Sequence, residues 1–318
     1  MKVDASDKEL LSYVYHNHHQ STSEIARNTS LTRNQVEYRL RKYEDNGLIR
    51  KYFPVFDYAK LGYNNVALLL LKFEKRRMSK EFVNTLAKNK NTISYGETHN
   101  RYDLYLNCVF KDDNEINEFI SNLFEHKNHY ITDYKLIQPT HLELYPLKLF
   151  DHPQKEQYTL TKKKDKKPLD ETDKKLLEGL AQDPRSKLLK LARKADVSVE
   201  VAHYRLKHLK EEFILGNRIQ FNLEILGYQH SMVLLNFKAF SKENKKRLQT
   251  FAKNTQETQT LIFNVHKPHC MIQLLYQEEQ TLRERITQIK ELFNNQHLEV
   301  EILLIEQEHQ PINPLPFL

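Results

Sequence analysis

Glycine is scarce in this chain. Only 6 of the 318 residues are glycine, and no two of them lie closer than eleven positions. Loops that cradle phosphate groups need closely spaced glycines, because the backbone itself must approach the phosphate. The G-x-G-x-x-G and G-x-x-x-x-G-K-[ST] motifs are therefore absent. Their absence excludes the common dinucleotide-binding and P-loop classes of protein.

Cysteine and long apolar runs are also scarce. The two cysteines, Cys108 and Cys270, are 162 positions apart and form no C-x-x-C motif, which is typical of reduced thiols inside the cell. The longest apolar run, Val66–Leu71, is far shorter than the roughly 18–20 residues that a membrane helix needs. The first residues contain no apolar signal core. We therefore expect a cytoplasmic protein with no membrane partner.

The charge is weakly positive. The chain has 49 Lys and Arg residues against 42 Asp and Glu residues, which gives a net charge of +7. This balance permits binding to nucleic acid without demanding it, since many soluble proteins reach a similar charge. At roughly 150 residues per domain, the length predicts about two domains.

A tandem repeat spans nearly the whole chain. The matching pairs, offset by 166 or 165 positions, are Ser6–Leu11 with Thr172–Leu177, Glu24–Arg27 with Lys190–Arg193, Tyr38–Tyr43 with Tyr204–Leu209, and Leu61–Tyr63 with Leu226–Tyr228. Four ordered matches at almost one offset indicate a duplicated unit. Between the two copies, the lysine-rich run Lys162–Lys167 lies between Pro153 and Pro168. Its composition predicts an exposed, self-repelling linker, with contact to phosphates as the alternative.

The first part of each repeat has the pattern of three short helices and a wing. In copy one, apolar spacing predicts helices over 7–15, with Ser6 as the cap, over 22–28 and from Thr32 to about Asp45. Val36, Leu40 and Tyr43 form the buried face of the third helix, and Asn46-Gly47 ends it. Residues 48–55 are expected to form a strand pair or wing. This order is typical of a winged helix-turn-helix.

The second part of each repeat changes to a β-α-β-β-α-β order, which is the ferredoxin-like arrangement. The expected elements are 65–73, 79–88, 92–98, 102–110, 112–124 and 130–144 in copy one, and 228–238, 242–253, 258–265, 269–276, 279–293 and 298–306 in copy two. The fold class is therefore α+β, with two copies of a two-domain unit. The expected domains are 1–55 and 169–221 (winged helix-turn-helix), 56–150 and 222–318 (βαββαβ), and 151–168 (basic linker).

These features together resemble the Lrp/AsnC, or feast/famine, family of transcription regulators. The resembling segments are Asp7-x-x-Leu-Leu, Glu24-Ile-Ala, Val36-x-x-Arg39-Leu, Gly47-Leu-Ile49, Leu61-Gly-Tyr63 and Arg101-Tyr-Asp-Leu104. The resemblance implies double-stranded DNA as a partner, pairing through the βαββαβ domains, further self-association and an amino-acid-like effector. Family members normally carry one copy. This chain therefore resembles both halves of a dimer joined covalently, and its two βαββαβ domains are expected to pair face to face.

The predicted DNA contacts centre on the third helix of copy one. Its first turn carries Thr32, Arg33, Asn34 and Gln35, side chains that suit base edges in the major groove. Candidate phosphate contacts are Arg39, Arg41, Lys42, Arg50 and Lys51. The alternative interpretation is a solvated helix face, with Arg39 packed structurally.

Copy two differs at the equivalent turn, which reads Ser198, Val199, Glu200 and Val201. A carboxylate opposes approach to phosphates, and valines offer no hydrogen bonds to bases. The basic residues His203, Arg205, Lys207 and Lys210 remain, and no glycine ends the helix. Three outcomes stay open: weak DNA contact, a different half-site, or an interaction module. Two recognition helices with different side chains at their first turns, which we call the two readers, favour an asymmetric DNA site.

The resemblance also implies an effector site at the turn before the third strand of the βαββαβ domain. In copy one the residues are Thr98, His99, Asn100 and Asp103, with Asn100 where glycine is common. Copy two reads Val265–Cys270 and lacks both the glycine and the aspartate. A standard pair of effector sites is therefore doubtful.

An enzyme alternative shares the architecture. Siroheme decarboxylases resemble the same two-domain unit and use His and Arg near this turn, where this chain has His99 and Arg101. A cationic recognition helix is not what that reaction requires, so we expect no enzymatic activity and no cofactor. The histidine-rich segments His16–His19 and His266–Cys270 lack the usual zinc spacings, and no metal is expected.

Overall fold

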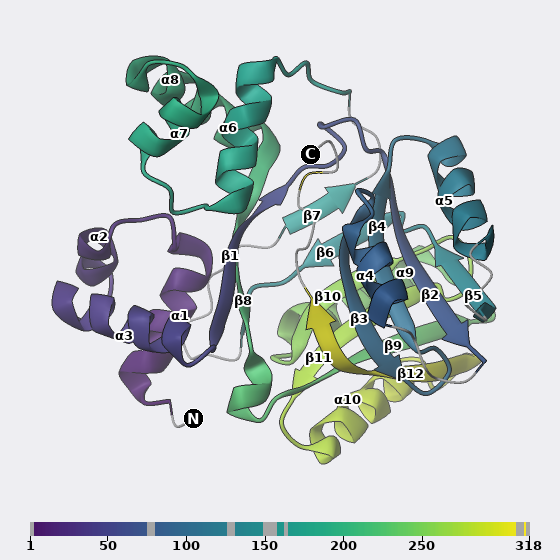
Figure 1. Cartoon of the computed structure of the whole chain (residues 1–318). Coiled ribbons are helices and arrows are strands. Elements are labelled where there is room, and N and C mark those ends of the chain that lie inside the picture. Colours follow the sequence, from purple (N-terminus) through teal and green to yellow (C-terminus); the bar gives the residue numbers. More distant parts are fainter. Residues whose placement is uncertain are drawn as a thin grey trace. The chain divides into compact units, whose positions relative to one another are not determined.

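The computed structural model describes residues 3–74, 80–125, 131–148, 158–161, 165–309 and 315. The chain forms two compact units. One consists of Met1–Leu61, Pro146–Tyr158 and Asp165–Gly227, and the other of Gly62–Tyr145, Thr159–Lys164 and Tyr228–Leu318. The first holds both helix-turn-helix segments and the second both βαββαβ segments (Figure 1). Residues 151–157 and 162–164 of the expected linker lie outside the described residues.

The first helix-turn-helix has the predicted order of elements. It contains α1 (Ala5–Asn17), α2 (Thr22–Arg27), α3 (Arg33–Asp45) and β1 (Ile49–Phe56). Val36, Leu40 and Tyr43 are buried on α3, and Gly47 follows the helix with a φ of +73°, as the Asn-Gly pair predicts. The Ser6 cap was wrong. Asp4 caps α1 by accepting from the Asp7 backbone N–H, because the helix begins one residue before Ser6.

The second helix-turn-helix repeats this arrangement with a longer third helix. It contains α6 (Glu171–Gln182), α7 (Leu188–Ala195), α8 (Val199–Phe213) and β8 (Ile214–Phe221), followed by the short 3-10 helix η1 (Leu223–Leu226). With no glycine to end it, α8 continues directly into β8, where Ile214 is its extended C-cap.

The expected wing is not a hairpin within each copy. Each copy supplies one strand, and β1 pairs antiparallel with β8, for example Tyr52 with Ile219 and Pro54 with Asn217. Figure 1 shows the two strands running side by side. Among the described residues, β1 pairs with no strand of its own copy, so its backbone N–H and C=O groups need a partner elsewhere. The duplicated chain provides the equivalent strand, β8. The two helix-turn-helix segments are thus joined by a shared two-stranded ribbon.

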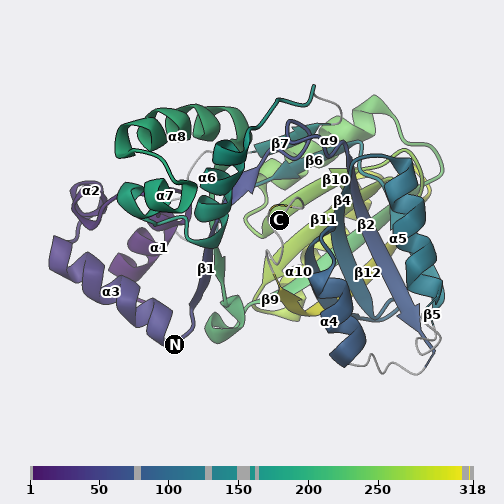
Figure 2. The same ribbon diagram turned by 45° about the horizontal axis from the view of Figure 1, so that its top comes forward.

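The second unit is built around one ten-stranded sheet. Its first half contains β2 (Asn65–Phe73), α4 (Lys80–Lys88), β3 (Thr92–His99), β4 (Leu104–Phe110), α5 (Asp113–Glu125) and β5 (Ile131–Ile137); its second half contains β9 (Gln229–Phe237), α9 (Lys242–Asn254), β10 (Thr258–Phe263), β11 (Cys270–Tyr276), α10 (Glu279–Leu292) and β12 (Leu298–His309). The strand order is β5-β2-β4-β3-β12-β9-β11-β10-β6-β7. Each half therefore has the 4-1-3-2 order of a ferredoxin-like sheet. Figure 2 shows α5 running along β2 of the first half.

The expected strand over 130–144 is two strands. After β5, the chain breaks at Gln138-Pro139 and forms β6 (His141–Leu144), which pairs with β10 of the second half. Proline cannot donate a ladder hydrogen bond, so a strand that would contain Pro139 is interrupted there. The further strand β7 (Tyr158–Thr161) follows β6 at the sheet edge. Residue 130, like residue 79 of the expected helix, lies outside the described residues.

Buried side chains alternate between the two faces of the sheet. On β2, Leu69 and Leu71 pack with α4 and α5, whereas Leu68 and Leu70 belong to a cluster that contains no helical residue. That second cluster also holds Met232 and Leu234 of β9 and so joins the two halves. Because three strands separate β2 from β9, the sheet must curve until its helix-free faces meet. This explains why Val66–Leu71 is continuously apolar, since both faces of β2 are covered.

Two further findings concern the cysteines and the apolar character of the helices. Both cysteines are buried without a disulfide, and burial raises the pKa of the Cys108 thiol to about 12. Among the helices described, none combines the length and apolar character that a membrane crossing demands.

Candidate nucleic-acid interface

The first turn of α3 is held by a reciprocal cap. Thr32 is the N-cap, and its hydroxyl accepts from the Gln35 backbone N–H at 3.3 Å. The Gln35 side-chain oxygen in turn accepts from the Thr32 backbone N–H at 2.8 Å and from its hydroxyl at 3.0 Å. This capping box occupies the acceptor of Gln35 that a bidentate bond to adenine would need. Thr32 and Gln35 therefore position the turn, and Arg33 and Asn34 are left to face outward.

Arg33 and Asn34 are the exposed polar side chains at the start of α3. The Arg33 side chain is 65% exposed, and its Nε lies 2.9 Å from Glu37 Oε1. That pairing leaves the two terminal nitrogens of the guanidinium for another partner. Hydrogen bonds from Arg33 and Thr22 lower the pKa of Glu37, so the carboxylate is charged and orients the arginine. Within the described part of the chain, no residue bonds the Asn34 side chain.

Arg39 has partners of its own. Its Nη1 pairs with the carboxylates of Asp4, at 3.3 Å, and of Asp7. Asp7 is buried and also accepts from the hydroxyl of the buried Tyr43. These contacts tie the start of α1 to the middle of α3, so the structure assigns Arg39 a positioning role. A phosphate contact by Arg39 would require it to leave these carboxylates.

Three other predicted cations are exposed. Arg41, Lys42 and Arg50 form no ion pair with any residue that the structure describes. Lys51 differs, because it is half-buried in β1 and burial lowers its pKa below the ordinary value. The cationic flank of α3 is therefore formed by Arg41, Lys42 and Arg50.

The second helix-turn-helix presents other chemistry at the same place. Ser198 caps α8 by accepting from the Val201 backbone N–H at 3.2 Å, as Thr32 caps α3. Glu200 is exposed and Val201 is 43% exposed, at the positions of Asn34 and Gln35. The first turn of α8 thus shows a carboxylate and an apolar group where α3 shows hydrogen-bonding groups.

The ion pairs of Arg39 with two aspartates of the first helix have a counterpart in copy two. Arg205 lies 166 positions after Arg39, and its Nη1 pairs with Asp170 at 2.5 Å and with Asp173 at 2.9 Å. The structure therefore gives Arg205 the same positioning role. His203 and Lys207 remain exposed on α8.

The predicted effector residues separate into two pairs. Thr98 and Asp103 are buried and bonded internally, with Thr98 Oγ1 donating to the Tyr102 carbonyl and Asp103 accepting from Lys72 Nζ and the Phe73 backbone N–H, all at 2.9 Å. His99 and Asn100 are exposed and contact β12. His99 Nε2 lies 2.8 Å from Glu306, and Asn100 Nδ2 donates to the Ile302 carbonyl at 2.8 Å. An effector role for these four residues stays a prediction.

Copy two rebuilds the same turn with different side chains. His269 replaces Asp103, because its Nδ1 accepts from the Phe237 backbone N–H at 3.2 Å, the counterpart of the bond from Phe73. Asn264 replaces Thr98 and donates to the Pro268 carbonyl at 2.7 Å. Residues 264–269 therefore correspond to 98–103, and the sequence comparison with Val265–Cys270 was one residue out of register.

The sequence-based set omits two exposed tyrosines. Tyr38 on α3 and Tyr204 on α8 are 69% and 77% exposed and occupy equivalent positions, 166 residues apart. An exposed aromatic ring at the same place on both helices is a candidate contact for sugars or base faces. The repeat offset was the signal that could have identified them.

No metal site emerges in the described part of the chain, where no group of three or more His, Cys, Asp or Glu side chains is arranged to hold an ion. His18, from one of the histidine-rich segments, is buried beside Tyr52 with ring centroids 5.1 Å apart. Burial, with the neighbouring charges of His19 and Arg185, lowers its pKa to about 3. It is a neutral packing residue.

Comparison with protein families matches both helix-turn-helix segments. Residues 3–50 match the winged helix-turn-helix DNA-binding family, and residues 169–210 match the AsnC-type helix-turn-helix domain. The HTH-type transcriptional regulator FL11 of Pyrococcus horikoshii is 28% identical over 118 residues, which are 37% of this chain and 78% of the relative. An uncharacterized HTH-type transcriptional regulator of Pyrococcus furiosus is 24% identical over 123 residues, 39% of this chain and 82% of the relative.

A solved structure matches almost the whole length. The siroheme decarboxylase NirDL superposes with a TM-score of 0.61 at 14% identity, covering 97% of this chain and 93% of NirDL. At this identity the likeness shows the fold. Two helix-turn-helix segments and two α+β segments in this arrangement therefore have a full-length counterpart among known structures.

Proposed function

We propose that this chain, whose two helix-turn-helix segments match the winged and AsnC-type DNA-binding families, is a sequence-specific DNA-binding transcription regulator of the Lrp/AsnC type. The observation that carries the proposal is the outward pair Arg33 and Asn34 on the capped first turn of α3. Arginine suits guanine and asparagine suits adenine in the major groove. The relatives named HTH-type transcriptional regulators support this function over a catalytic one.

The positive flank of α3 supplies the affinity in this proposal. Arg41, Lys42 and Arg50 neutralise phosphates, and binding therefore weakens steeply as salt is added. Thr32, Gln35 and Arg39 act indirectly, by fixing the helix through the capping box and the carboxylates of α1. His203 and Lys207 are the corresponding basic residues of α8, whose Glu200 limits the approach of this helix to DNA.

The two βαββαβ halves serve as an intramolecular pseudo-dimer in this proposal. Their support is the continuous sheet, in which β3 of the first half pairs with β12 of the second, and the buried cluster shared by the helix-free faces. A single chain then presents two unequal readers. The DNA site it prefers is asymmetric, with α3 specifying the dominant half.

Replacing Asn34 tests the role of α3. We expect Asn34→Ala to weaken binding to a selected duplex by about 1–3 kcal/mol, the worth of one bidentate base contact. Binding to random duplex changes little, because Asn34 carries no charge. Fluorescence anisotropy with both duplexes measures the difference.

The matched control is Glu200→Ala, at the equivalent position of α8. Removing this carboxylate leaves specific binding unchanged or strengthens it. If Asn34→Ala binds the selected duplex as the unaltered chain does, α3 is not the principal reader.

A siroheme decarboxylase function is the second candidate, and the full-length fold match with NirDL is the observation that favours it. His99 and Arg101 lie on the relevant turn, but they pair with Glu306 at 2.8 Å and with Glu301 at 3.5 Å. Both side chains are thus directed at carboxylates of β12. Anaerobic incubation with siroheme distinguishes the two functions, since a regulator leaves its absorption spectrum unchanged and a decarboxylase alters it.

A further inference from the structure

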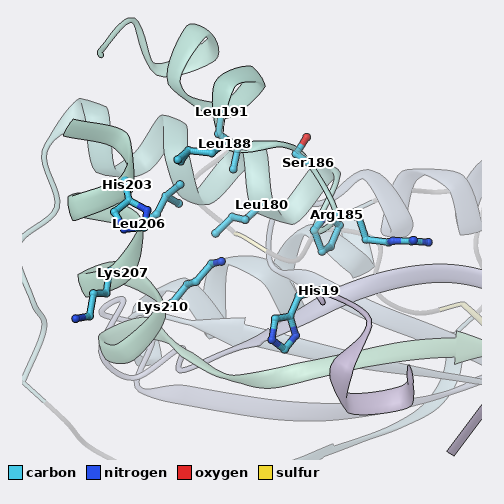
Figure 3. Close-up of a pocket in the computed structure, with 11 residues that line it drawn as sticks. His19, Leu180, Arg185, Ser186, Leu188, Leu191, His203, Leu206, Lys207 and Lys210 are labelled. Carbon is cyan, nitrogen blue, oxygen red and sulfur yellow. The ribbon is translucent and has the colours of Figure 1, made fainter. Parts of the chain in front are cut away.

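A cavity of about 350 Å³ lies in the second helix-turn-helix, bounded by α6, α7, α8 and the turn 184–186 (Figure 3). We call it the α7–α8 cavity. Its floor is formed by Leu180, Leu188, Leu191 and Leu206, of which all but Leu188 are buried. Cavities of roughly 300–1,000 Å³ with an apolar lining and a few polar groups are typical of small-molecule sites.

The remaining lining of the α7–α8 cavity is strongly basic. It includes His19, Arg185, His203, Lys207 and Lys210, and none of the described residues that line it is acidic. Figure 3 shows the Lys210 ammonium directed towards Leu180, over the apolar floor. The Lys207 ammonium and the Arg185 guanidinium point away from it, and Arg185 is held by Glu44 at 3.2 Å. Lys210 is therefore the cation placed to meet an anion inside the cavity.

No described residue compensates the charge of Lys210 with an ion pair. An ammonium group beside leucine side chains, without a carboxylate partner, attracts an anion that brings its own apolar part. Charge and apolar surface at this place thus select the same kind of ligand.

Two residues that line the α7–α8 cavity differ in chemistry from their counterparts in copy one. Leu188 and His203 occupy the positions of Thr22 and Glu37, 166 residues earlier. There, Thr22 Oγ1 donates to Glu37 Oε1 at 3.0 Å and links α2 to α3. Copy two has replaced that hydrogen-bonded pair, including its negative charge, with an apolar group and a basic one.

We propose that the α7–α8 cavity binds a small amphipathic carboxylate, such as a medium-chain aliphatic acid. The carboxylate pairs with Lys210 Nζ, and the chain lies over the four leucines. Two lining residues, His203 and Lys207, also belong to the DNA contact proposed for α8. The inference therefore adds a ligand to the second helix-turn-helix, whose first turn has lost the base-reading side chains of α3, whereas the contacts of α3 itself do not involve this site.

Isothermal titration of the full chain with sodium octanoate, without DNA, tests the site. We expect saturable binding of one octanoate per chain, weaker binding of 1-octanol and none of octylammonium. Lys210→Gln weakens octanoate binding by about tenfold or more, as expected for a lost charged hydrogen bond. Lys207→Gln, which removes the same charge from the same helix, has a smaller effect. Octanol binding as tightly as octanoate, or equal losses in both variants, overturns the proposal.

A second variant introduces into copy two the threonine–glutamate pair that Thr22 and Glu37 form in copy one. Leu188→Thr combined with His203→Glu restores the Thr–Glu pair and places a carboxylate in the lining. Circular dichroism checks that the helices are retained. We expect this double variant to lose octanoate binding. Unchanged binding, or no binding by the unaltered chain, contradicts the inference. Since no DNA is present, either result is independent of whether α3 reads DNA.

Discussion

Arg39 and Arg205 show how two residues with a DNA-binding appearance serve the fold. Each lies in the middle of a third helix and pairs with two aspartates at the start of a first helix, 166 positions apart in the repeat. The two sets of ion pairs differ in how deeply the aspartates are buried. Asp7 is 5% exposed and also accepts from Tyr43, whereas Asp173 is 19% exposed and Leu209 stands at the position of Tyr43. Copy one therefore depends more on its carboxylate.

We expect Asp7→Asn to be more destabilising than Asp173→Asn. Asp7→Asn removes the buried carboxylate partner of Arg39 and leaves the exposed carboxylate of Asp4, which here costs about 2–3 kcal/mol after allowing for the partial exposure of Arg39. The more exposed Asp173 costs about 1 kcal/mol. Urea unfolding of the two variants measures the difference in free energy of unfolding. Equal losses would show that the Tyr43–Asp7 contact adds nothing.

At the scale of elements, the sequence predicted which segments form helices and strands but not how the strands pair. Apolar spacing and caps are local, and they located α3 and the elements of each βαββαβ half within a few residues, except for the strand expected over 130–144, which Pro139 divides into β5 and β6. Paired strands lie far apart in the sequence. The pairing of β1 with β8 and of β6 with β10 could therefore not be predicted from the hydrophobic periodicity of each strand. At the start of α3, the predicted N-cap Thr32 is confirmed because a cap is local, whereas the ion pairs of Arg39 with Asp4 and Asp7 join residues far apart in the sequence and agree with the alternative of a structural role. The DNA contacts of this turn stay a prediction.

Gly96 lies on β3, which pairs with β12 where the two halves of the sheet meet, and its replacement tests the packing there. A Cβ at this position would lie 2.3 Å from Tyr105 Cε1, and the Tyr105 hydroxyl bonds Glu308 of β12. Because the ring is fully buried, Gly96→Ala should destabilise the chain by about 1–3 kcal/mol through overpacking.

Gly179→Ala is the control for this prediction. Its Cβ would meet only the end of the Leu191 side chain, at 2.5 Å, and alanine favours the helix. Thermal unfolding compares the two variants. A loss in Gly179→Ala as large as that in Gly96→Ala would mean that the Tyr105 contact has no special importance.

The whole molecule carries two helix-turn-helix segments and two sheet halves in one chain. Under the proposed function, a single chain can therefore present two recognition helices to DNA without the meeting of two chains. Linked modules raise each other's effective concentration only when both engage. With Arg33 and Asn34 on α3 and Glu200 and Val201 on α8, the two readers cannot prefer the same half-site. Asymmetry of the DNA site is therefore the central consequence of the duplication and divergence.

Selection of binding sites from random duplex by the full chain, followed by footprinting, tests this claim most directly. We expect one enriched asymmetric site, with the protection of one half lost in Asn34→Ala and retained in Glu200→Ala. A symmetric palindrome protected equally on both halves, or no enriched sequence at all, would contradict it.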